Sequence, residues 1–311
     1  MNKKLNKLFF TFLFTSIIIG CGTLKNKHSI SENAESYYLK AFDILNNTTH
    51  NSLSDSLSSQ ALSYIDKAIS INSKISKYHR VKGSTYIHRK EYNTAIPNFE
   101  KAIEIDSNNS LAWMGLGIAY ENISKFEMAE KNYLKALDDI ELSRTVFFNL
   151  GLLYSKWGKY NSSIESYSNA IQIYPKYRGA YLNRGKVKLG LKKYAEAIVD
   201  FNMAISLDPT DKVSYNNRGL ARHYTNQFNE AIQDFKKALE INLDNSFNEN
   251  FDTNKYAYNN IANSYYAMND TENACVYWNK AIEVGYKYQI EWKEEYNIDD
   301  PIELIKEHCS K

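Results

Sequence analysis

The chain has 311 residues, of which 43% are hydrophobic and 24% are charged. Its 38 Lys and Arg residues nearly balance its 36 Asp and Glu residues, and loss of residues 1–20, which hold three lysines and no acid, would leave 35 basic against 36 acidic residues. A chain without a basic excess lacks the electrostatic attraction that drives nucleic-acid binding, so the composition argues against nucleic acid as the partner.

The N-terminal segment reads as an export signal. Lysines within the first seven residues precede a mostly apolar run from Leu8 to Ile19, which is too short for a stable membrane-spanning helix and has the layout of a signal peptide. The four residues that end in Cys21, Ile-Ile-Gly-Cys, resemble the bacterial lipobox, in which the cysteine receives a diacylglycerol and becomes the new N-terminus. An ordinary secretory peptide with an incidental cysteine is the alternative.

The lipobox resemblance implies that residues 1–20 are removed and that acyl chains on Cys21 hold the protein at a membrane, at about 0.8 kcal/mol per buried CH2. Gly22 rather than Asp follows the cysteine, which in Gram-negative lipoproteins favours the outer membrane. No acidic cluster follows that would signal surface export. We therefore expect a lipid-anchored protein of the bacterial cell envelope, on the outer membrane and facing the periplasm, with residues 21–33 as a flexible polar tether.

Residues 34–75 read as a pair of helices. The first is expected near Ala34 to Leu45, and the second carries small and apolar residues at a helical spacing, namely Ala61, Ile65 and Ala68. The polar loop between the two helices is unusually long.

A 34-residue period then runs over residues 76–245 and, after an inserted loop at 246–254, recurs over 255–288. Counted from the first residue of each repeat, positions 8, 20 and 27 are small and position 24 is aromatic. Position 8 is Gly83, Gly117, Gly151, Gly185, Gly219 and Ala262, and position 24 is Phe99, Tyr133, Tyr167, Phe201, Phe235 and Trp278. Small positions accept large side chains from a neighbouring helix, and Ala61, Ile65 and Ala68 match positions 20, 24 and 27.

The repeat at 110–143 carries the fullest pattern, Trp113-x2-Leu116-Gly117-x2-Tyr120 followed by Ala129 and Tyr133. This pattern resembles the tetratricopeptide repeat. The resemblance implies an all-α fold, a right-handed α-solenoid of about seven helix-turn-helix units with a concave inner surface. Residues 34–75 would form a divergent first unit, 76–245 five units, 255–288 the last unit and 289–311 a C-terminal cap with a capping helix.

Two repeats depart from the shared pattern at position 11. Lys188 and Arg222 stand where other repeats have tyrosine.

No catalytic, metal or cofactor motif is visible. The six histidines are scattered without a His-Glu-x-x-His or a Cys-x-x-Cys spacing, and no Gly-x-Ser-x-Gly or Ser-x-x-Lys set is present. Gly115-Leu116-Gly117 lacks the preceding strand and the third glycine of a phosphate loop. We therefore interpret the chain as a non-enzyme that needs no cofactor or metal.

Cys275 and Cys309 remain as a pair if Cys21 is lipidated. In an oxidising compartment a bond between them would join the C-terminal cap to the last repeat, and closure of a loop of about 34 residues could add roughly 3 to 4 kcal/mol. Similar tetratricopeptide lipoproteins often carry an Ala-Cys-x2-Trp helix and a C-terminal cysteine, which supports the pairing. Two independent buried thiols are the alternative.

The candidate binding residues lie on the first helix of each repeat. The family resemblance places position 6 on the concave face, and in four successive repeats that position is asparagine, as Asn149, Asn183, Asn217 and Asn260. A side-chain amide donates and accepts hydrogen bonds, so it can pair with the backbone of an extended peptide. Positions 5 and 9 add the apolar side chains of the candidate groove, Phe148, Leu152, Leu182 and Leu220. Alternatively, the asparagines bond within the repeat array.

Similarity to tetratricopeptide lipoproteins implies a membrane-anchored, non-catalytic scaffold or adaptor that binds an envelope protein, or an extended peptide segment, through its concave groove. A glycan-capture lipoprotein and a self-associating structural lipoprotein are the alternative functions. The inserted loop carries Phe247 and Phe251, which either meet a partner or pack beneath the solenoid edge. The identity of the partner and the oligomeric state stay open at this point.

Overall fold

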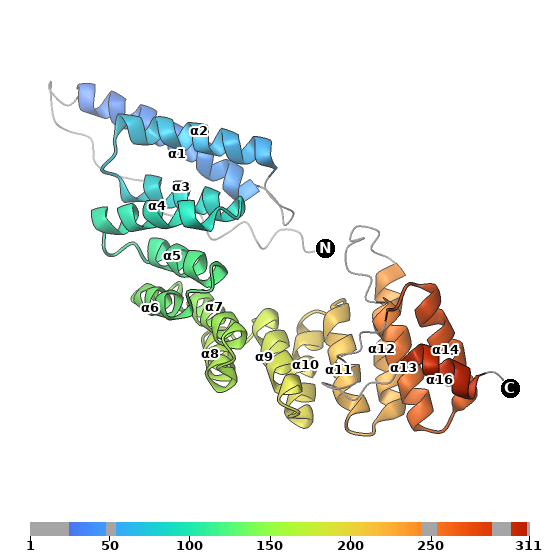
Figure 1. Ribbon diagram of the computed structural model, residues 1–311. Helices are drawn as coiled ribbons and strands as arrows, with labels where there is room; N and C mark the ends of the chain where they lie inside the picture. The colour runs from blue at the N-terminus through green and yellow to red at the C-terminus, as the bar shows by residue number, and fades with distance from the viewer. Residues whose placement is uncertain (1–24, 48–53, 244–253, 288–299, 310–311) are drawn as a thin grey trace. The chain divides into compact units, whose positions relative to one another are not determined.

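The computed structural model describes residues 25–47, 54–243, 254–287 and 300–309. Within these ranges the chain is helical and contains no strand, and the helices pack in consecutive pairs joined by short turns, as Figure 1 shows. The predicted all-α solenoid is therefore confirmed. The predicted signal segment, Cys21 and the loop with Phe247 and Phe251 lie outside the described residues.

The helices divide into two compact units. The unit that ends at Ser107 contains α1 (Lys25–Asn47), α2 (Asp55–Ile71), α3 (Ser76–His88) and α4 (Tyr92–Ile105). The unit that starts at Asn108 contains α5 (Ser110–Asn122), α6 (Phe126–Ala136), α7 (Ser143–Lys156), α8 (Tyr160–Ile173), α9 (Arg178–Gly190), α10 (Tyr194–Leu207), α11 (Lys212–His223), α12 (Phe228–Leu243), α13 (Asn254–Ala267), α14 (Thr271–Glu283) and α16 (Pro301–His308). First helices of the 34-residue repeats thus begin at the expected repeat start or one residue before it.

Helix α1 starts earlier than the sequence indicates. It begins at Lys25, whereas the sequence indicated a start near Ala34, so residues 25–33 are helical. Ala34, Tyr38 and Ala41 are buried in the core of the first unit with residues of α2 and α3. Once such a packed helix exists, each further residue gains a backbone hydrogen bond without a new nucleation cost, so a polar segment can extend it.

A glycine and an aromatic ring hold each of five helix pairs together. An ideal Cβ built on Gly151 would lie 2.5 Å from Cε1 of Tyr167, and one on Gly185 would lie 2.7 Å from Cε1 of Phe201. Real Cβ atoms do not approach so closely, so glycine is required at these places. The same contact recurs in Gly83–Phe99, Gly117–Tyr133 and Gly219–Phe235. The predicted fit of small positions to large side chains is confirmed.

Every first helix from α3 to α13 ends in the same turn. The residue at position 15 has a left-handed backbone, and the following amide bonds back to the carbonyl of position 11, as in Lys193 N to Lys188 O at 2.9 Å. This is the hydrogen-bond pattern of a Schellman motif, which favours glycine or asparagine. The position is occupied by Lys90, Ser124, Gly158, Lys192, Asn226 and Asn269.

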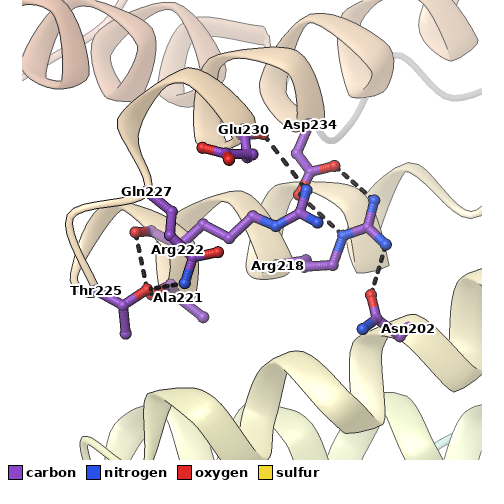
Figure 2. Close-up of polar contacts among 8 residues, drawn as sticks. All are labelled: Asn202, Arg218, Ala221, Arg222, Thr225, Gln227, Glu230 and Asp234. Atoms are coloured by element: carbon purple, nitrogen blue, oxygen red, sulfur yellow. Dashed lines mark hydrogen bonds and ion pairs between the residues drawn. The ribbon is translucent and has the colours of Figure 1, made fainter.

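Buried ion pairs explain the two departures at position 11. In repeat 212–245, Asp234 receives two hydrogen bonds from the Arg218 guanidinium, at 2.9 and 2.6 Å, and a third from Arg222 at 2.7 Å (Figure 2). In repeat 178–211, Arg184 and Lys188 contact Asp200 in the same way, at 2.6 and 2.9 Å.

These acids have almost no contact with solvent. The side chains of Asp200 and Asp234 are 1% and 4% exposed, so each carboxylate requires its two cations. Asp200 and Asp234 both occupy position 23 of their repeats. Lys188 and Arg222 therefore stand in place of the tyrosine of other repeats because they supply a positive charge to these aspartates.

The C-terminal helix α16 packs on the last helix pair. Asp300 caps it by accepting from the amide of Ile302, and Leu304 and Ile305 contact the cluster of Ala262, Ala274 and Trp278. A disulfide joins Cys275 to Cys309 with a Cα–Cα distance of 5.7 Å, 34 residues apart in the chain. The sulfur bridge therefore links α14 to the end of α16. Among the described helices, none has the length and apolar character needed to cross a bilayer.

Candidate peptide-binding groove

The first helices of neighbouring repeats form a continuous layer in the second unit. Helix α5 contacts α7, α7 contacts α9, α9 contacts α11 and α11 contacts α13, in addition to the contacts within each helix pair. Among the described second helices, no pair shows comparable contact across a repeat. Helices on the inside of a curved stack approach one another most closely, so the first helices line its inner side.

All four asparagines of position 6 lie on this layer and are half-buried. The side-chain nitrogen of Asn183 donates to the carbonyl of Gly179 at 2.9 Å, and that of Asn217 donates to Val213 O at 2.8 Å. One N–H of each amide is thus bonded within its own helix. An amide has two N–H groups and an oxygen acceptor, so capacity for a ligand remains at both sites.

A cavity of about 510 Å³ opens between α7 and α9, above Tyr160 and Tyr167 of α8. Leu152 and Asn183, two residues of the predicted groove, both line it. The lining is completed by Ser155 and Lys156 of α7, by Lys186, Val187 and Gly190 of α9, and by Leu191, which follows α9. The cavity combines aliphatic surface with hydroxyl, amide and ammonium groups, a combination suited to a segment of polypeptide.

The other predicted groove residues have a packing role. Phe148 stacks on Tyr177 with ring centroids 5.0 Å apart and packs edge-on against Tyr167. Leu182 packs on the cluster around Phe201, and Leu220 packs on the cluster around Phe235. These three side chains are half-buried between repeats, and among the predicted apolar set it is Leu152 that lines the described cavity.

A buried carboxylate lies next to the cavity. Glu121 is 7% exposed, accepts a hydrogen bond from the Tyr133 hydroxyl at 2.7 Å, and forms an ion pair with Lys156. Burial, and secondarily the charge of Glu121, raise the pKa of the Tyr167 hydroxyl above its ordinary value. The Tyr167 hydroxyl therefore stays protonated at neutral pH.

Asn263, at position 9 of the last repeat, has a structural role. Asn263 accepts from the indole nitrogen of Trp278 at 2.9 Å, within the helix pair α13–α14. Across the described residues, no group of three or more His, Cys, Asp or Glu side chains is arranged to hold a metal ion.

Family models match most of the repeat region. Models of the tetratricopeptide repeat match residues 145–177, 179–211, 213–245 and 256–284, and a TPR repeat model matches 83–124. The chain belongs to the tetratricopeptide-repeat (TPR) family. The resemblance to the tetratricopeptide repeat is thereby confirmed.

Solved TPR structures share this fold at low sequence identity. The C-terminal part of a TPR repeat-containing protein from Cytophaga hutchinsonii is 16% identical, with a TM-score of 0.64 over 84% of this chain and 100% of that chain. Pseudomonas aeruginosa pilF is 18% identical, with a TM-score of 0.55 over 76% of this chain and 97% of that one. PilW, described as a widely conserved type IV pilus biogenesis factor, is 18% identical, with a TM-score of 0.56 over 70% and 97%. A search of curated proteins gives no significant match.

As a TPR protein, the chain is a scaffold for protein–protein interaction, and TPR proteins are generally non-catalytic. Sequence reasoning found Asn183 and Leu152 but missed Lys156 and Lys186, which line the same cavity. The signal was present, because Lys186 occupies position 9, where the preceding repeat has Leu152. A charged residue at an inner position of one repeat marks a site that packing alone does not explain.

Proposed function

We propose that this chain is a lipid-anchored, non-catalytic TPR scaffold of the bacterial cell envelope, which recruits another envelope protein by binding an extended segment along its first helices. The cavity between α7 and α9 carries the proposal, because it joins Leu152 and Asn183, which come from different repeats. Stacked repeats present one such set of inner positions per 34 residues. An extended segment can therefore contact several similar sites one after another.

The anchoring part of the proposal rests on the sequence before the repeats. Lysines, an apolar run and Gly20-Cys21 support lipidation at Cys21, and Gly22 favours the outer membrane with the repeats in the periplasm. Metabolic labelling with an alkyne-modified palmitate tests it. Wild type and Cys309→Ser should take up the label, whereas Cys21→Ser should not. Label on Cys21→Ser would reject the anchor.

Crosslinking in intact envelopes, read by mass spectrometry, tests the recruitment. The Asn183→Ala, Asn217→Ala double variant should lose a protein crosslinked by wild type, since each net hydrogen bond contributes about 1 kcal/mol. Asn279→Ala is the matched control, because its side-chain nitrogen also donates to the carbonyl four residues earlier, at 2.9 Å, but lies on the second helix α14. Equal crosslinking by all three proteins would reject the groove, and crosslinks between copies alone would favour self-association.

A further inference from the structure

A cavity of about 310 Å³ opens between two second helices near the C-terminal end of the array. Helices α12 and α14 both pack on α13, and the cavity lies in the space between them (Figure 1). All three helices contribute to its lining, which consists of Lys236, Leu239, Glu240, Asn254, Tyr258, Tyr277 and Lys280. None of these residues lines the cavity between α7 and α9, so the two cavities can be tested separately.

Two lysines converge on one tyrosine ring in this cavity. The Nζ atom of Lys236 lies 5.9 Å from the centroid of the Tyr277 ring, and the Nζ atom of Lys280 lies 4.9 Å from the same centroid. Lys236 also donates a hydrogen bond to the Tyr265 hydroxyl at 3.5 Å. Contacts of an ammonium group with an aromatic face hold the charge in place over such distances. The cavity therefore contains two positive charges that come from different helices.

These two charges are not neutralised by acidic side chains. Both lysines are exposed, and neither forms an ion pair within the ranges that the structure describes. Glu240, the acidic residue of the lining, pairs with Lys237 instead, at 3.0 Å. Neighbouring ammonium groups without a counter-charge repel each other, so an anion bound between them is favoured.

The packing of a repeat does not require the tyrosine at this place. Tyr277 stands at position 23 of its repeat, and this position is polar but never tyrosine in the five repeats of residues 76–245. There it is Asn98, Asn132, Ser166, Asp200 and Asp234. The ring on which the two lysines converge is therefore a feature of the last helix pair and not of the repeat pattern.

The first helix pair carries a similar cluster. Tyr64 and Lys67 of α2 stand at positions 23 and 26, as Tyr277 and Lys280 do in the last repeat. The rings of Tyr37 and Tyr64 have centroids 6.3 Å apart, the same distance as between Tyr258 and Tyr277. Lys40 and Lys67 place their Nζ atoms between 5.5 and 6.0 Å from both rings of the first pair. The recurrence indicates that lysine and tyrosine are combined for a common purpose.

The number of charges restricts which anion fits the cavity. A phosphate monoester carries a charge of about −1.5 to −2 at pH 7 and three acceptor oxygens, whereas a carboxylate carries a single charge. Lysine binds phosphate as a point charge, and two lysines match the charge of the monoester. Leu239 and the Tyr258 ring add apolar surface for the carbon skeleton to which the phosphate is attached.

We propose that the cavity between α12, α13 and α14 binds a phosphate monoester, with Lys236 and Lys280 as the ion-pair partners of the phosphate group. The monoester is either a soluble sugar phosphate or the headgroup of a membrane lipid, and both carry the group that the two lysines recognise. The site is separate from the proposed groove, so this ligand and a protein partner can be bound at the same time.

Scintillation-proximity binding to the full chain in detergent tests the site with two phosphate monoesters, tritiated glucose 6-phosphate and tritiated phosphatidic acid. Lys40→Gln and Lys67→Gln are present in every protein compared, so that the cluster of the first helix pair adds no binding. Glucose 6-phosphate should be displaced by inorganic phosphate and not by glucose, and phosphatidic acid should not be displaced by phosphatidylcholine. Saturable binding of the sugar phosphate alone identifies a soluble ligand, and binding of the lipid alone identifies a headgroup. Binding of both supports recognition of the phosphate itself, and binding of neither overturns the proposal.

Two double variants then locate the site. Lys236→Gln with Lys280→Gln should weaken binding by about tenfold or more, because both charges that face the phosphate are lost. Lys131→Gln with Lys135→Gln is the matched control, since it removes the same net charge from exposed positions of the second helix α6. Those lysines line a cavity that also holds three acidic residues, so the control should stay within about twofold of the unchanged protein. Unchanged affinity in the first variant, or equal weakening in both, overturns the proposal.

Discussion

The ring of Tyr167 lies directly on Gly151, so closely that a Cβ at residue 151 would come within 2.5 Å of Cε1 and 2.6 Å of Cδ1. Tyr167 itself is 1% exposed and its ring packs against Phe148. The contact between Gly151 and the Tyr167 ring therefore sets the distance between α7 and α8.

Gly151→Ala should lower the free energy of unfolding by about 2 kcal/mol, because overpacking forces either the ring or the helix to move. Gly190→Ala is the control, since this helical glycine has nothing within 4 Å of an added Cβ. It should leave the stability unchanged or raise it by up to about 1 kcal/mol. Urea unfolding followed by circular dichroism measures both, and equal effects would show that the Gly151 contact is not tight.

Lys192→Gly should stabilise the protein by about 1 kcal/mol. Lys192 holds a left-handed backbone with φ of 59°, which costs a non-glycine residue about 1 kcal/mol or more. The equivalent residue of the preceding repeat, Gly158, has φ of 77°, so Gly158→Ala should destabilise by a similar amount. Thermal melting of the two variants checks the opposite signs, and a destabilising Lys192→Gly would mean that the lysine side chain has a role the geometry does not reveal.

Asp234→Ala should destabilise by about 3 kcal/mol, because Arg218 and Arg222 would keep buried charge without a counter-ion. The triple variant Arg218→Leu, Arg222→Tyr, Asp234→Asn installs the residues found at the same positions of repeat 110–143. It should lie within about 1 kcal/mol of wild type or above it, since a well-packed apolar set can replace a buried ion pair. A triple variant as unstable as Asp234→Ala would contradict this account.

Stability should fall as the pH drops below about 6.5. His223 Nδ1 lies 2.9 Å from Ser264 Oγ, and the imidazole packs against the rings of Tyr224 and Phe228. Burial lowers the pKa of His223 from its ordinary value of 6.5. The unfolded chain then binds a proton more readily than the folded chain, so the contribution is full above that value and is lost as the pH falls through the lowered pKa.

The control for this pH effect is His223→Gln, which keeps a hydrogen-bonding group near Ser264 and does not titrate. Between pH 7 and pH 5 it should lose less stability than wild type in urea unfolding. Parallel losses in the two proteins would assign the pH dependence elsewhere, His88 included, whose pKa is also lowered by burial.

The sequence predicted the parts of the fold in which the same side-chain contact recurs in every repeat. A small residue at position 8 and an aromatic residue at position 24 indicate a contact between the two helices of a repeat, and Gly151 and Tyr167 make this contact. The left-handed turn at Lys192 could not be predicted from the sequence, because lysine does not favour a left-handed backbone. The packing of the two helices that it joins imposes the turn.

The site was predictable to a smaller extent. Periodicity placed Asn183 and Leu152 on the correct helices, but which inner side chains line a cavity and which fill a repeat interface depends on the volume of every neighbour. Leu182 and Leu152 have the same residue type and similar inner positions, yet Leu182 packs on the Phe201 cluster. The pairing of Arg184 with Asp200 and of Arg218 with Asp234, each 16 residues apart, was a signal that position-by-position reading missed.

The two arginines of position 7 each also reach the preceding repeat. Arg184 donates to Ser168 of α8 at 2.9 Å, and Arg218 donates to Asn202 of α10 at 2.7 Å. Each guanidinium therefore bonds both within its own helix pair and across the interface with the preceding repeat, so the helix pair and the interface cannot open independently. Amides of α8, α10 and α12 should exchange with solvent through a shared opening event, which native-state hydrogen exchange would resolve as similar opening free energies. The arginines then set the cooperativity length of the array, the span over which separate repeats melt as one.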